Sequence, residues 1–563
     1  MVSFPPGLLL LIAAAIVPFT TGRARAAVVV TAPVLTLLAV WTVPAGEGAL
    51  LHYLGQPLDP VHPSAAGRLF ATVFSLVALG GAVFALPVAR TLEYVAAFVY
   101  AGAAIGVTFA GDWVSLFVCW ELMAVASMAV VWAGGTERAW RASLRYIHIH
   151  ILGGVVLMFG IAGWIAQTGS VAIGPIEPSS IAAWCMLAGI LVNAGAPPLW
   201  PWIADAYPEA SPSGTVFLSA YTTKTAVFVL LVAFPGVELL VWLGLAMIAY
   251  GALYALLADD MRRLLAHSIV GQVGFMLVCI GVGTPLALDA AAAHAVAHIL
   301  YKALLLMAAG SVIYVTGRRL MSELGGLGRT MRLTAACAFV GGLAIAAAPL
   351  TAAFASKSLI TAALAKAHAA PAWFGVMAGS ALALVYVGLR FPWFTFCGRE
   401  RGVHAEDPPA PMRGAMIAFA VLIVLLGLYP PGLYALLPHG SSYHPYTLDH
   451  VLAQVELLAF SALVFFALLP LLRPRPGRAL DVDWLWRVPG GWLARHLTDA
   501  LGTARARLER TGRRRLDRAI DGALPPPRPA RHPGAHLARR EHGVLGRRDA
   551  RGLPAALLPL RPA

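Results

Sequence analysis

The chain has 563 residues, of which 59% are hydrophobic and 12% are charged, and its mean hydropathy is +0.76. Soluble domains carry about 25% charged residues. Apolar runs of about 18 residues or more recur from end to end, and each is long enough to cross a hydrocarbon core of about 30 Å. The composition excludes a soluble globular protein and predicts a polytopic α-helical membrane protein.

The basic excess lies at the C-terminal end. The formal net charge is +14, and residues 473–563, with 20 Arg against 8 Asp and Glu, account for +12 of it. The membrane part is therefore almost neutral, which excludes a nucleic-acid-binding protein. A basic tail of this kind is typical of the cytoplasmic side of a membrane.

We predict an all-α fold of about fifteen membrane spans. No basic residue precedes the first apolar run, so we expect a retained helix rather than a signal peptide. The expected spans cover residues 6–22, 26–44, 68–88, 91–110, 112–133, 144–167, 181–203, 214–235, 238–258, 264–284, 289–316, 333–366, 371–396, 412–433 and 450–472.

Loops that contain arginine alternate along the chain with loops that contain almost none. Loops after odd-numbered spans are basic, except the loop at 204–213, and loops after even-numbered spans carry almost no Lys or Arg. The positive-inside rule then places the N-terminus outside and the C-terminal tail in the cytoplasm. The arginines of the basic loops are Arg23, Arg25, Arg90, Arg138, Arg141, Arg262, Arg263, Arg318, Arg319, Arg329, Arg332, Arg399, Arg401, Arg413, Arg473, Arg475 and Arg478.

Proline interrupts two of the expected spans. "LVNAGAPPLWPWIADA" carries Pro197, Pro198 and Pro201, and "LAIAAAPLTAAFASKSLI" carries Pro349. Proline breaks or kinks a helix, and in a membrane the freed carbonyls must face protein or water. One such proline alone is more often a packing kink, but broken helices five spans apart are typical of inverted repeats in ion-coupled transporters.

The chain is therefore predicted to contain two inverted five-helix repeats. The expected parts are N-terminal transmembrane helices at 1–90, a first repeat at 91–235, a second repeat at 238–396, C-terminal transmembrane helices at 412–472 and a basic tail at 473–563.

One apolar run contains a stripe of ionisable residues. In "HAVAHILYK", His294, His298 and Lys302 are spaced i, i+4 and i+8, so they share one face of a helix. Ionisable groups at membrane depth are costly and mark ion paths. Haem ligation by the two histidines is disfavoured, because residues one turn apart point to the same side.

Three further charges have mostly apolar neighbours on both sides: Glu121, Lys224 and Lys357. A snorkelling lysine is the alternative for any one of them alone, and a satisfied core histidine is the alternative for His148 and His150. Desolvation brings the proton affinities of lysine and glutamate towards neutral pH, where histidine also titrates. Joined by water, such groups would pass protons laterally through the bilayer centre.

No cofactor or metal site is expected. The five cysteines lie singly, without a CxxC spacing, and "GGLGRT" lacks the lysine and the spacing of a phosphate-binding loop.

Six stretches, in order over roughly residues 90–400, resemble the antiporter-like proton-translocating subunits shared by respiratory complex I, membrane-bound hydrogenases and Mrp-type Na⁺/H⁺ antiporters. They are "LFVCWELMAVASM", "PLWPWIADAYPEA", "LSAYTTKTAVF", "DDMRRLLAHSIVGQVGFM", "AHAVAHILYKALLLMAAGSVI" and "PLTAAFASKSLI". The chain is most similar to the D-type subunit of the Mrp antiporters.

The resemblance implies a role for each buried residue. Glu121 matches a glutamate that modulates the first half-channel, and Lys224 matches the lysine at the centre of the eighth helix. Lys357 matches a lysine that exchanges protons with the outer side. His294, His298 and Lys302 match a stripe that links the two half-channels.

The resemblance also implies a setting and leaves the function class open. It implies other antiporter subunits and lipid as partners, H⁺ and Na⁺ as transported ions, and a bacterial plasma membrane. The same module serves redox-driven pumps, and since the chain has no redox motif, it would be at most the membrane arm of an NADH-quinone oxidoreductase-type complex. A lone transporter of an organic solute fits a lateral file of charges poorly.

One position departs from the family pattern. Relatives commonly carry a lysine, paired with the glutamate, five residues before the "PL" of the first broken helix. Here that position is Asn193, which cannot hold a proton. The partner of Glu121 is therefore open, with Lys224 as the obvious substitute.

The tail contains an apolar stripe among arginines. Residues 484–522 place Leu493, Leu497, Leu501, Ala504 and Leu508 on one helical face. This pattern predicts an amphipathic helix on an anionic leaflet, with a solvated charged helix as an equal alternative. From about 523 the Pro- and Arg-rich composition predicts disorder.

Overall fold

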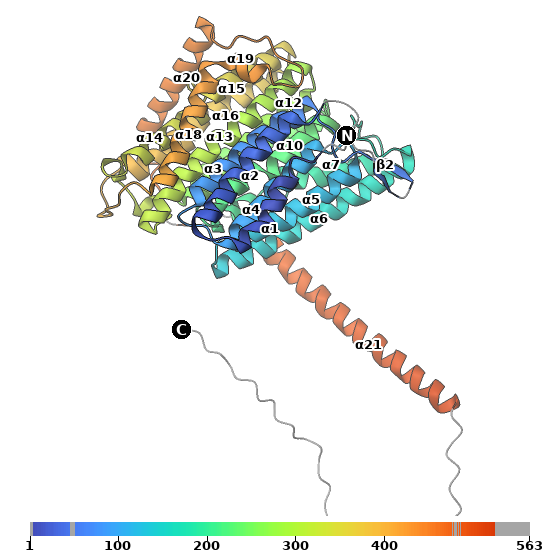
Figure 1. The fold of residues 1–563 in the computed structure, drawn as a ribbon. Helices are drawn as coiled ribbons and strands as arrows, with labels where there is room; N and C mark the ends of the chain where they lie inside the picture. The colour runs from blue at the N-terminus through green and yellow to red at the C-terminus, as the bar shows by residue number, and fades with distance from the viewer. Residues whose placement is uncertain are drawn as a thin grey trace, which may run out of the picture. The chain divides into compact units, whose positions relative to one another are not determined.

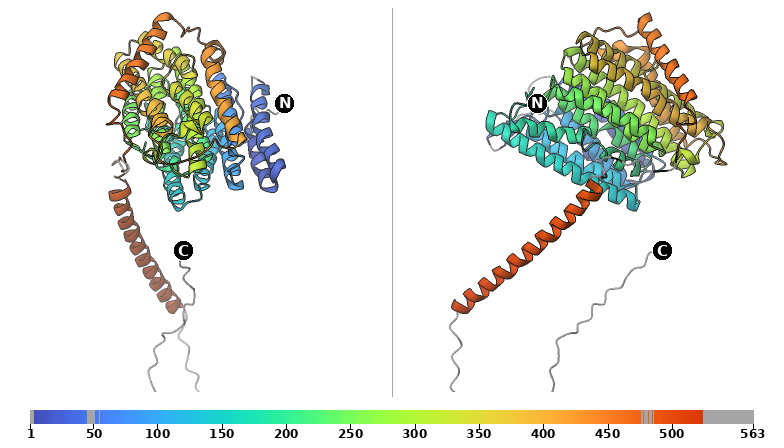
Figure 2. Two further views of the ribbon diagram at one scale, coloured as in Figure 1. Left: turned by 90° about the vertical axis from the view of Figure 1, so that its left-hand side faces the viewer. Right: turned by 180° about the vertical axis from the view of Figure 1, so that it is seen from behind.

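The computed structural model describes residues 4–44, 51–53, 55–475, 477, 481, 484 and 486–523. The chain divides into two units, Met1–Leu485 and Trp486–Ala563. The described part of the first unit is a bundle of helices that run side by side, with a small β-hairpin at one end (Figures 1 and 2).

The elements of the first half of this bundle are α1 (Leu8–Ile16), η1 (Val17–Phe19), α2 (Gly22–Thr42), β1 (Leu51–Tyr53), β2 (Gln56–Leu58), α3 (Ala65–Ala85), α4 (Thr91–Phe109), α5 (Trp113–Trp132), α6 (Glu137–Thr168), α7 (Ile181–Ala194), α8 (Trp202–Ala206), η2 (Tyr207–Glu209), α9 (Gly214–Ala220) and α10 (Thr222–Ala233). Strands β1 and β2 pair antiparallel, with Tyr53 opposite Gln56.

The elements of the second half are α11 (Leu239–Leu257), α12 (Met261–Val282), α13 (Pro285–Thr316), η3 (Met321–Glu323), η4 (Leu327–Arg329), α14 (Arg332–Ile345), α15 (Ala352–Lys366), α16 (Ala370–Ala383), η5 (Leu384–Leu389), α17 (Arg390–Pro392), η6 (Trp393–Cys397), α18 (Ala410–Leu428), α19 (Pro430–Tyr434) and α20 (Leu448–Ala467). Segments η5 and η6 are π-helical.

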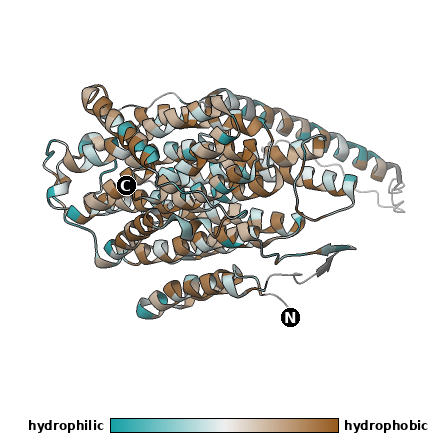
Figure 3. Ribbon diagram, turned by 90° about the horizontal axis from the view of Figure 1, so that it is seen from above, coloured by the Kyte–Doolittle hydropathy of each residue, from teal (hydrophilic) through white to brown (hydrophobic). Residues whose placement is uncertain are grey.

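The all-α multi-pass fold predicted from the sequence is confirmed. Among the described residues, 12 helices are long and apolar enough to cross a membrane, and three shorter apolar helices accompany them at Leu8–Phe19, Ile181–Ala194 and Arg332–Ile345. Apolar residues dominate these helices, and hydrophilic residues gather in the connecting loops (Figure 3).

Side-chain caps fix several helix starts. Asp112 accepts a hydrogen bond from the Ser115 amide at the start of α5, and Asp260 accepts from the amides of Arg262 and Arg263 at the start of α12. Such caps satisfy N–H groups that the first helical turn leaves unpaired.

Both helices predicted to be broken are interrupted. Helix α7 ends at Ala194 and α8 begins at Trp202, while α14 ends at Ile345 and α15 begins at Ala352. A third interruption, at Tyr221 between α9 and α10, was not predicted, because no proline marks it. Each break leaves carbonyls without helical partners inside the bundle.

Helix α13 lies at the centre of the bundle and packs against α12, α14 and α15. It is 32 residues long, and 94% of its most apolar window is buried, so its side chains meet other helices rather than lipid. Any ionisable residue on α13 is therefore enclosed by protein.

The described part of the second unit is the π-helical turn η7 (Trp486–Gly490) followed by α21 (Gly491–Ala523). Leu497, Leu501 and Leu508 are all more than half exposed on α21. The helix predicted for the tail is present. Its contact with a membrane stays a prediction, and the expected disorder lies outside the described residues.

Candidate functional site

The stripe of α13 is wholly enclosed. The side chains of His294, His298 and Lys302 are 0% exposed. The two imidazole centroids lie 6.3 Å apart, and the ring of His298 lies 5.2 Å from that of Tyr301. The predicted alignment on one helical face therefore becomes a buried row.

Polar side chains of α12 and α15 hold this row in place. Lys302 Nζ donates to Ser268 Oγ at 2.5 Å. The two ring nitrogens of His294 lie 3.0 Å from Ser356 Oγ and 3.2 Å from Gln272 Oε1. The same Gln272 oxygen accepts from the Tyr301 hydroxyl at 2.9 Å.

His298 differs from its neighbours because neither of its ring nitrogens has a hydrogen-bond partner among the described residues. It lies within electrostatic range of both Lys224 and Lys302. An unsatisfied buried polar group costs about 1–3 kcal/mol, and water is the usual partner where protein supplies none. The unpartnered nitrogens of His298 therefore indicate a site where water can bind, within electrostatic range of both lysines.

Lys357 closes one end of the file. Its ammonium donates to the Ile345 carbonyl at 2.8 Å and to Ser380 Oγ at 3.2 Å, and it lies 4.7 Å from the centre of the Phe275 ring. Ile345 is the last residue of α14, so this lysine of α15 caps the broken half-helix from across the break.

Lys224 occupies a similar position at the other end. Its ammonium donates to the Ser219 carbonyl at 2.8 Å and to Thr223 Oγ1 at 3.0 Å. Ser219 belongs to α9 and Lys224 to α10, so this lysine also spans an interruption, the one at Tyr221. Lys224 is within electrostatic range of Lys302 on α13. Helix α13 therefore lies between the two lysines at the helix breaks, Lys224 and Lys357.

No ion pair involves Lys224, Lys302 or Lys357 in the part of the chain that the structure describes. Their partners are carbonyls, hydroxyls and a ring, none of which carries a full negative charge. An unpaired buried charge is costly, and each charge raises the cost of the next. Occupancy of one lysine by a proton is therefore coupled to occupancy of the others.

Glu121 does not join this file. It is half-buried on α5, beside Val118 and Val125, which are 62% and 59% exposed on the outer face of the helix. It forms no hydrogen bond or ion pair with another described residue, and its Oε1 rests against α6 so closely that a Cβ added at Gly154 would clash with it. The expected partnership with Lys224 is not seen.

Asn193, at the departure from the family pattern, is 1% exposed near the end of α7. Its Oδ1 is buried and has no hydrogen-bond partner among the described residues. The buried amide therefore leaves one polar atom unsatisfied at the position where the resemblance implies a lysine.

A group of hydroxyls at the start of α10 was missed from the sequence. Tyr100 and Thr222 share a 2.5 Å hydrogen bond, and Tyr146 lies 3.2 Å from Thr222 and 2.8 Å from Ser127. These residues come from α4, α5, α6 and α10, and all are buried. Ser, Thr and Tyr in apolar spans are common, so spacing alone could not single them out; the same applies to Ser268, Gln272 and Ser356.

Charged residues close the end of the bundle at which α9 begins. Arg319 binds both Asp260 and Glu209, with 3.0 Å to the latter, and Arg262 donates to the Ala210 carbonyl at 2.5 Å. Burial alone would raise the pKa of Glu209, but the hydrogen bond and charge of Arg319 outweigh it and lower that pKa. Ion pairs and hydrogen bonds of arginines therefore connect the elements at this end of the bundle.

The described residues contain no group of three His, Cys, Asp or Glu side chains placed to hold a metal ion. The lysines, histidines and hydroxyls of the site are groups that can donate and accept protons.

Comparison with known proteins agrees with this architecture. Residues 110–385 match the model of the family described as NADH:quinone oxidoreductase/Mrp antiporter, transmembrane. An uncharacterized protein of Mycobacterium tuberculosis is 32% identical over 374 residues, which cover 59% of this chain and 58% of that protein. The chain thus spans little more than half the length of this relative.

Two further relatives have functional names. The N-type subunit of the NADH-quinone oxidoreductase of Desulforudis audaxviator is 28% identical over 73% of this chain and 91% of its own length. The D-type subunit of the Na(+)/H(+) antiporter of Alkalihalophilus pseudofirmus is 28% identical over 45% of this chain and 55% of its own length.

Two solved structures share the fold. A chain of an archaeal membrane-bound sulfane sulfur reductase superposes with a TM-score of 0.71 and 26% identity, over 90% of this chain and 95% of that one. A chain of the Mrp complex from a Dietzia species gives a TM-score of 0.75 and 22% identity, over 88% of this chain and 60% of that one. Over residues 110–385 the chain is thus similar to the antiporter-like membrane subunits of the NADH:quinone oxidoreductase/Mrp antiporter family.

Proposed function

We propose that the chain is the proton-conducting subunit of a multisubunit cation/proton antiporter of the Mrp type. Protons move between Lys224 and Lys357 by way of His298, Lys302 and His294 on α13. The observation that carries the proposal is His298, a fully buried imidazole with both nitrogens unpartnered in the described structure and with Lys224 and Lys302 both in electrostatic range.

The proton path follows from what each group can donate and accept. A neutral imidazole accepts a proton on one nitrogen and releases one from the other, and a hydroxyl does both on one oxygen. Ser268 beside Lys302 and Ser356 beside His294 supply such hydroxyls. Gln272 carries no proton but orients His294 and Tyr301.

Glu121 takes a different role in this proposal. Since it lies at the outer edge of the bundle without a partner in the described part of the chain, it modulates the path rather than forming a link in it. Other subunits of the complex, with lipid, cover this apolar outer face in a bacterial plasma membrane.

The two lysines at helix breaks support the proposed inverted repeats, 91–235 and 238–396. Each repeat would supply one half of the path, with α13 as the link. The loop arginines support a cytoplasmic C-terminus and an N-terminus outside. Na⁺ is the proposed exchanged cation, with the name of the Na(+)/H(+) antiporter relative as its support.

A second candidate is the proton-pumping arm of a redox complex. It is favoured by the NADH-quinone oxidoreductase relative, which the chain matches over 91% of its length, and by the fold of the sulfane sulfur reductase chain. The buried file would be the same, and electron transfer in another subunit would drive it.

The test measures ΔpH in inside-out vesicles that contain the full assembly. We expect Na⁺ to collapse a respiration-generated ΔpH, and we expect Lys302→Ala to abolish this response. Lys366→Ala, which changes an exposed lysine at the end of α15, is the matched control. No cation response in the wild-type assembly refutes the antiporter. Proton uptake into the vesicles on adding an electron donor together with a quinone, lost in Lys302→Ala, would then establish the second candidate.

A further inference from the structure

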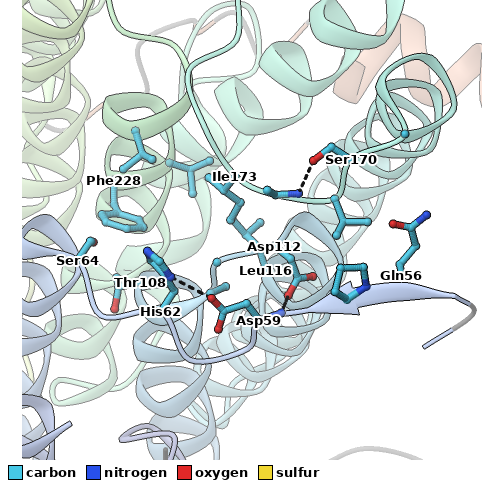
Figure 4. A pocket seen from close by; sticks show the side chains of 18 residues that line it. Gln56, Asp59, His62, Ser64, Thr108, Asp112, Leu116, Ser170, Ile173 and Phe228 are labelled. Carbon is cyan, nitrogen blue, oxygen red and sulfur yellow. Dashed lines mark hydrogen bonds and ion pairs between the residues drawn. The ribbon is translucent and has the colours of Figure 1, made fainter. Parts of the chain in front are cut away.

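A cavity of about 610 Å³ opens at one end of the first half of the bundle. It is lined by the loop that precedes α3, the start of α5 near Asp112, the loop after α6 near Ser170, and the last turns of α10 (Figure 4). Arg262 and Arg319 lie at the opposite end of the α9–α10 span, beside Ala210 and Glu209. The cavity is therefore on the predicted outer side.

The polar lining is anionic. Asp59 Oδ2 lies 2.9 Å from His62 Nδ1, and the Asp59 amide donates to Asp112 Oδ2 at 2.8 Å. The other Asp59 oxygen is buried and has no partner among the described residues. The lining includes two carboxylates and neither Lys nor Arg, so it attracts cations.

The floor of the cavity leads towards Lys224. Phe228, Val229 and Val232 of α10 line it, and Thr225 lies one turn deeper at the centre of the same helical face. The Thr225 side chain is 0% exposed, and its hydroxyl has no partner in the described structure. Lys224 lies at the edge of this face, roughly 6 Å along the helix axis from Phe228.

We propose that this cavity is an outer vestibule that takes a small hydrated monovalent cation, hydronium or Na⁺, and connects it to Lys224 through Thr225. The inference rests on the proposed function and adds a second route to the outside, distinct from the one through Lys357. The described carboxylates do not converge as the ligands of a tightly held metal would. That spacing suits weak binding and rapid release.

Cysteine labelling tests the route without measuring transport. Val229→Cys and Val232→Cys are placed in the full assembly after removal of Cys119, Cys185, Cys279, Cys337 and Cys397. Intact right-side-out spheroplasts are then treated with a membrane-impermeant trimethylammonium thiol reagent. Val227→Cys, on the same helix but outside the cavity lining, is the matched control, and Ser170→Cys marks the rim.

We expect labelling at positions 170, 232 and 229, and none at 227. An unlabelled Val229→Cys beside a labelled Ser170→Cys would overturn the route, as would labelling only in inside-out vesicles. Labelling of Val229→Cys by a lipophilic maleimide alone would also overturn it, because the cavity would then hold lipid rather than water. These results do not depend on transport, so they separate failure of the vestibule from failure of the proposed function.

Asp59→Asn tests which cation binds in the cavity. It keeps the shape of the side chain and removes its charge, and Glu177→Gln, an exposed acid in the loop before α7, is the control. A rise of about tenfold in the half-saturating Na⁺ concentration, roughly the effect of losing one favourable charge contact, identifies Na⁺. A shift in the pH dependence of transport, with an unchanged half-saturating Na⁺ concentration, identifies hydronium. Unchanged values for both would overturn cation binding at Asp59.

Discussion

Lys224 and Lys357 occupy comparable positions at two interrupted helices. Each is buried, and each donates at 2.8 Å to a carbonyl on the far side of a break, Ser219 for one and Ile345 for the other. A carbonyl at a helix C-terminus carries partial negative charge. The breaks thus provide the electrostatic support that acidic side chains do not give in the described structure.

The surroundings of the two lysines differ. Thr222, two residues before Lys224, belongs to the linked hydroxyls of Tyr100 and Tyr146, whereas Lys357 lies beside the Phe275 ring and donates to the hydroxyl of Ser380. The two lysines therefore have similar carbonyl partners across a helix break and different polar surroundings.

Removing either lysine is expected to have the largest effect. Lys224→Ala or Lys357→Ala should reduce transport by roughly 100-fold or more, because a group that carries every proton is lost. Cation-driven ΔpH collapse in vesicles measures it, with Lys366→Ala as the exposed control. Substantial transport by one variant, at wild-type protein levels, would show that the two ends are not equivalent.

His298→Gln separates proton transfer from packing at the link between the two ends. Gln fills similar space and hydrogen-bonds water but does not take up a proton near neutral pH. We expect transport to fall by about tenfold or more. His148→Gln, on the exposed face of α6, should leave it unchanged. Equal rates in both variants would remove His298 from the path.

Gly154→Ala tests whether the position of the Glu121 side chain affects transport. Because the new Cβ would clash with Glu121 Oε1, the carboxylate must move. We expect a partial loss of transport, smaller than that of Glu121→Ala. Gly414→Ala, which meets no atom within 4 Å, is the control. Full activity of Gly154→Ala would mean that the position of Glu121 is unimportant.

Asn193→Lys introduces, near the end of α7, the residue type that the resemblance implies at this position. The unsatisfied Asn193 oxygen is replaced by a group that holds a proton in a buried position. The transport rate is expected to rise above wild type in the same vesicle assay. A fall in rate with normal protein levels would indicate that this half has adapted to the amide.

The smallest expected effect concerns the charged end of the bundle. The pKa of Glu209 is lowered, so its ion pair with Arg319 stabilises the fold at neutral pH and loses this contribution as pH falls through the lowered pKa. Glu209→Gln should cost about 1–2 kcal/mol at pH 7 and little at strongly acidic pH.

Thermal unfolding in detergent at both pH values measures the Glu209 effect. Glu137→Gln, in a pair whose side chains are 68% and 69% exposed, should change little at either pH. A cost for Glu209→Gln that persists at acid pH would show that the contribution is packing rather than charge.

The sequence predicted most of the fold and the buried row of ionisable residues on α13. Long apolar runs are sufficient to place membrane helices, and prolines marked two of the breaks. The break at Tyr221 carries no proline, and it depends on how α9 and α10 pack against their neighbours. The partners Ser268 and Ser356 are ordinary residues of apolar spans, and only helix packing brings them to α13.

Glu121 shows a second limit of sequence reasoning. Apolar residues on both sides of a charge indicate depth in the membrane, but they do not distinguish a protein-facing from a lipid-facing position. The exposed Val118 and Val125 settle this for α5. Helix α5 is apolar on all sides, so its sequence contains no polar face from which orientation could be predicted.

The most direct test is an experimental map of the assembly that resolves ordered water around α13. We expect waters bonded to both ring nitrogens of His298, connecting it towards Lys224 on one side and Lys302 on the other. A dry apolar gap at His298, with the imidazole paired to a fixed protein group, would contradict proton passage along this file.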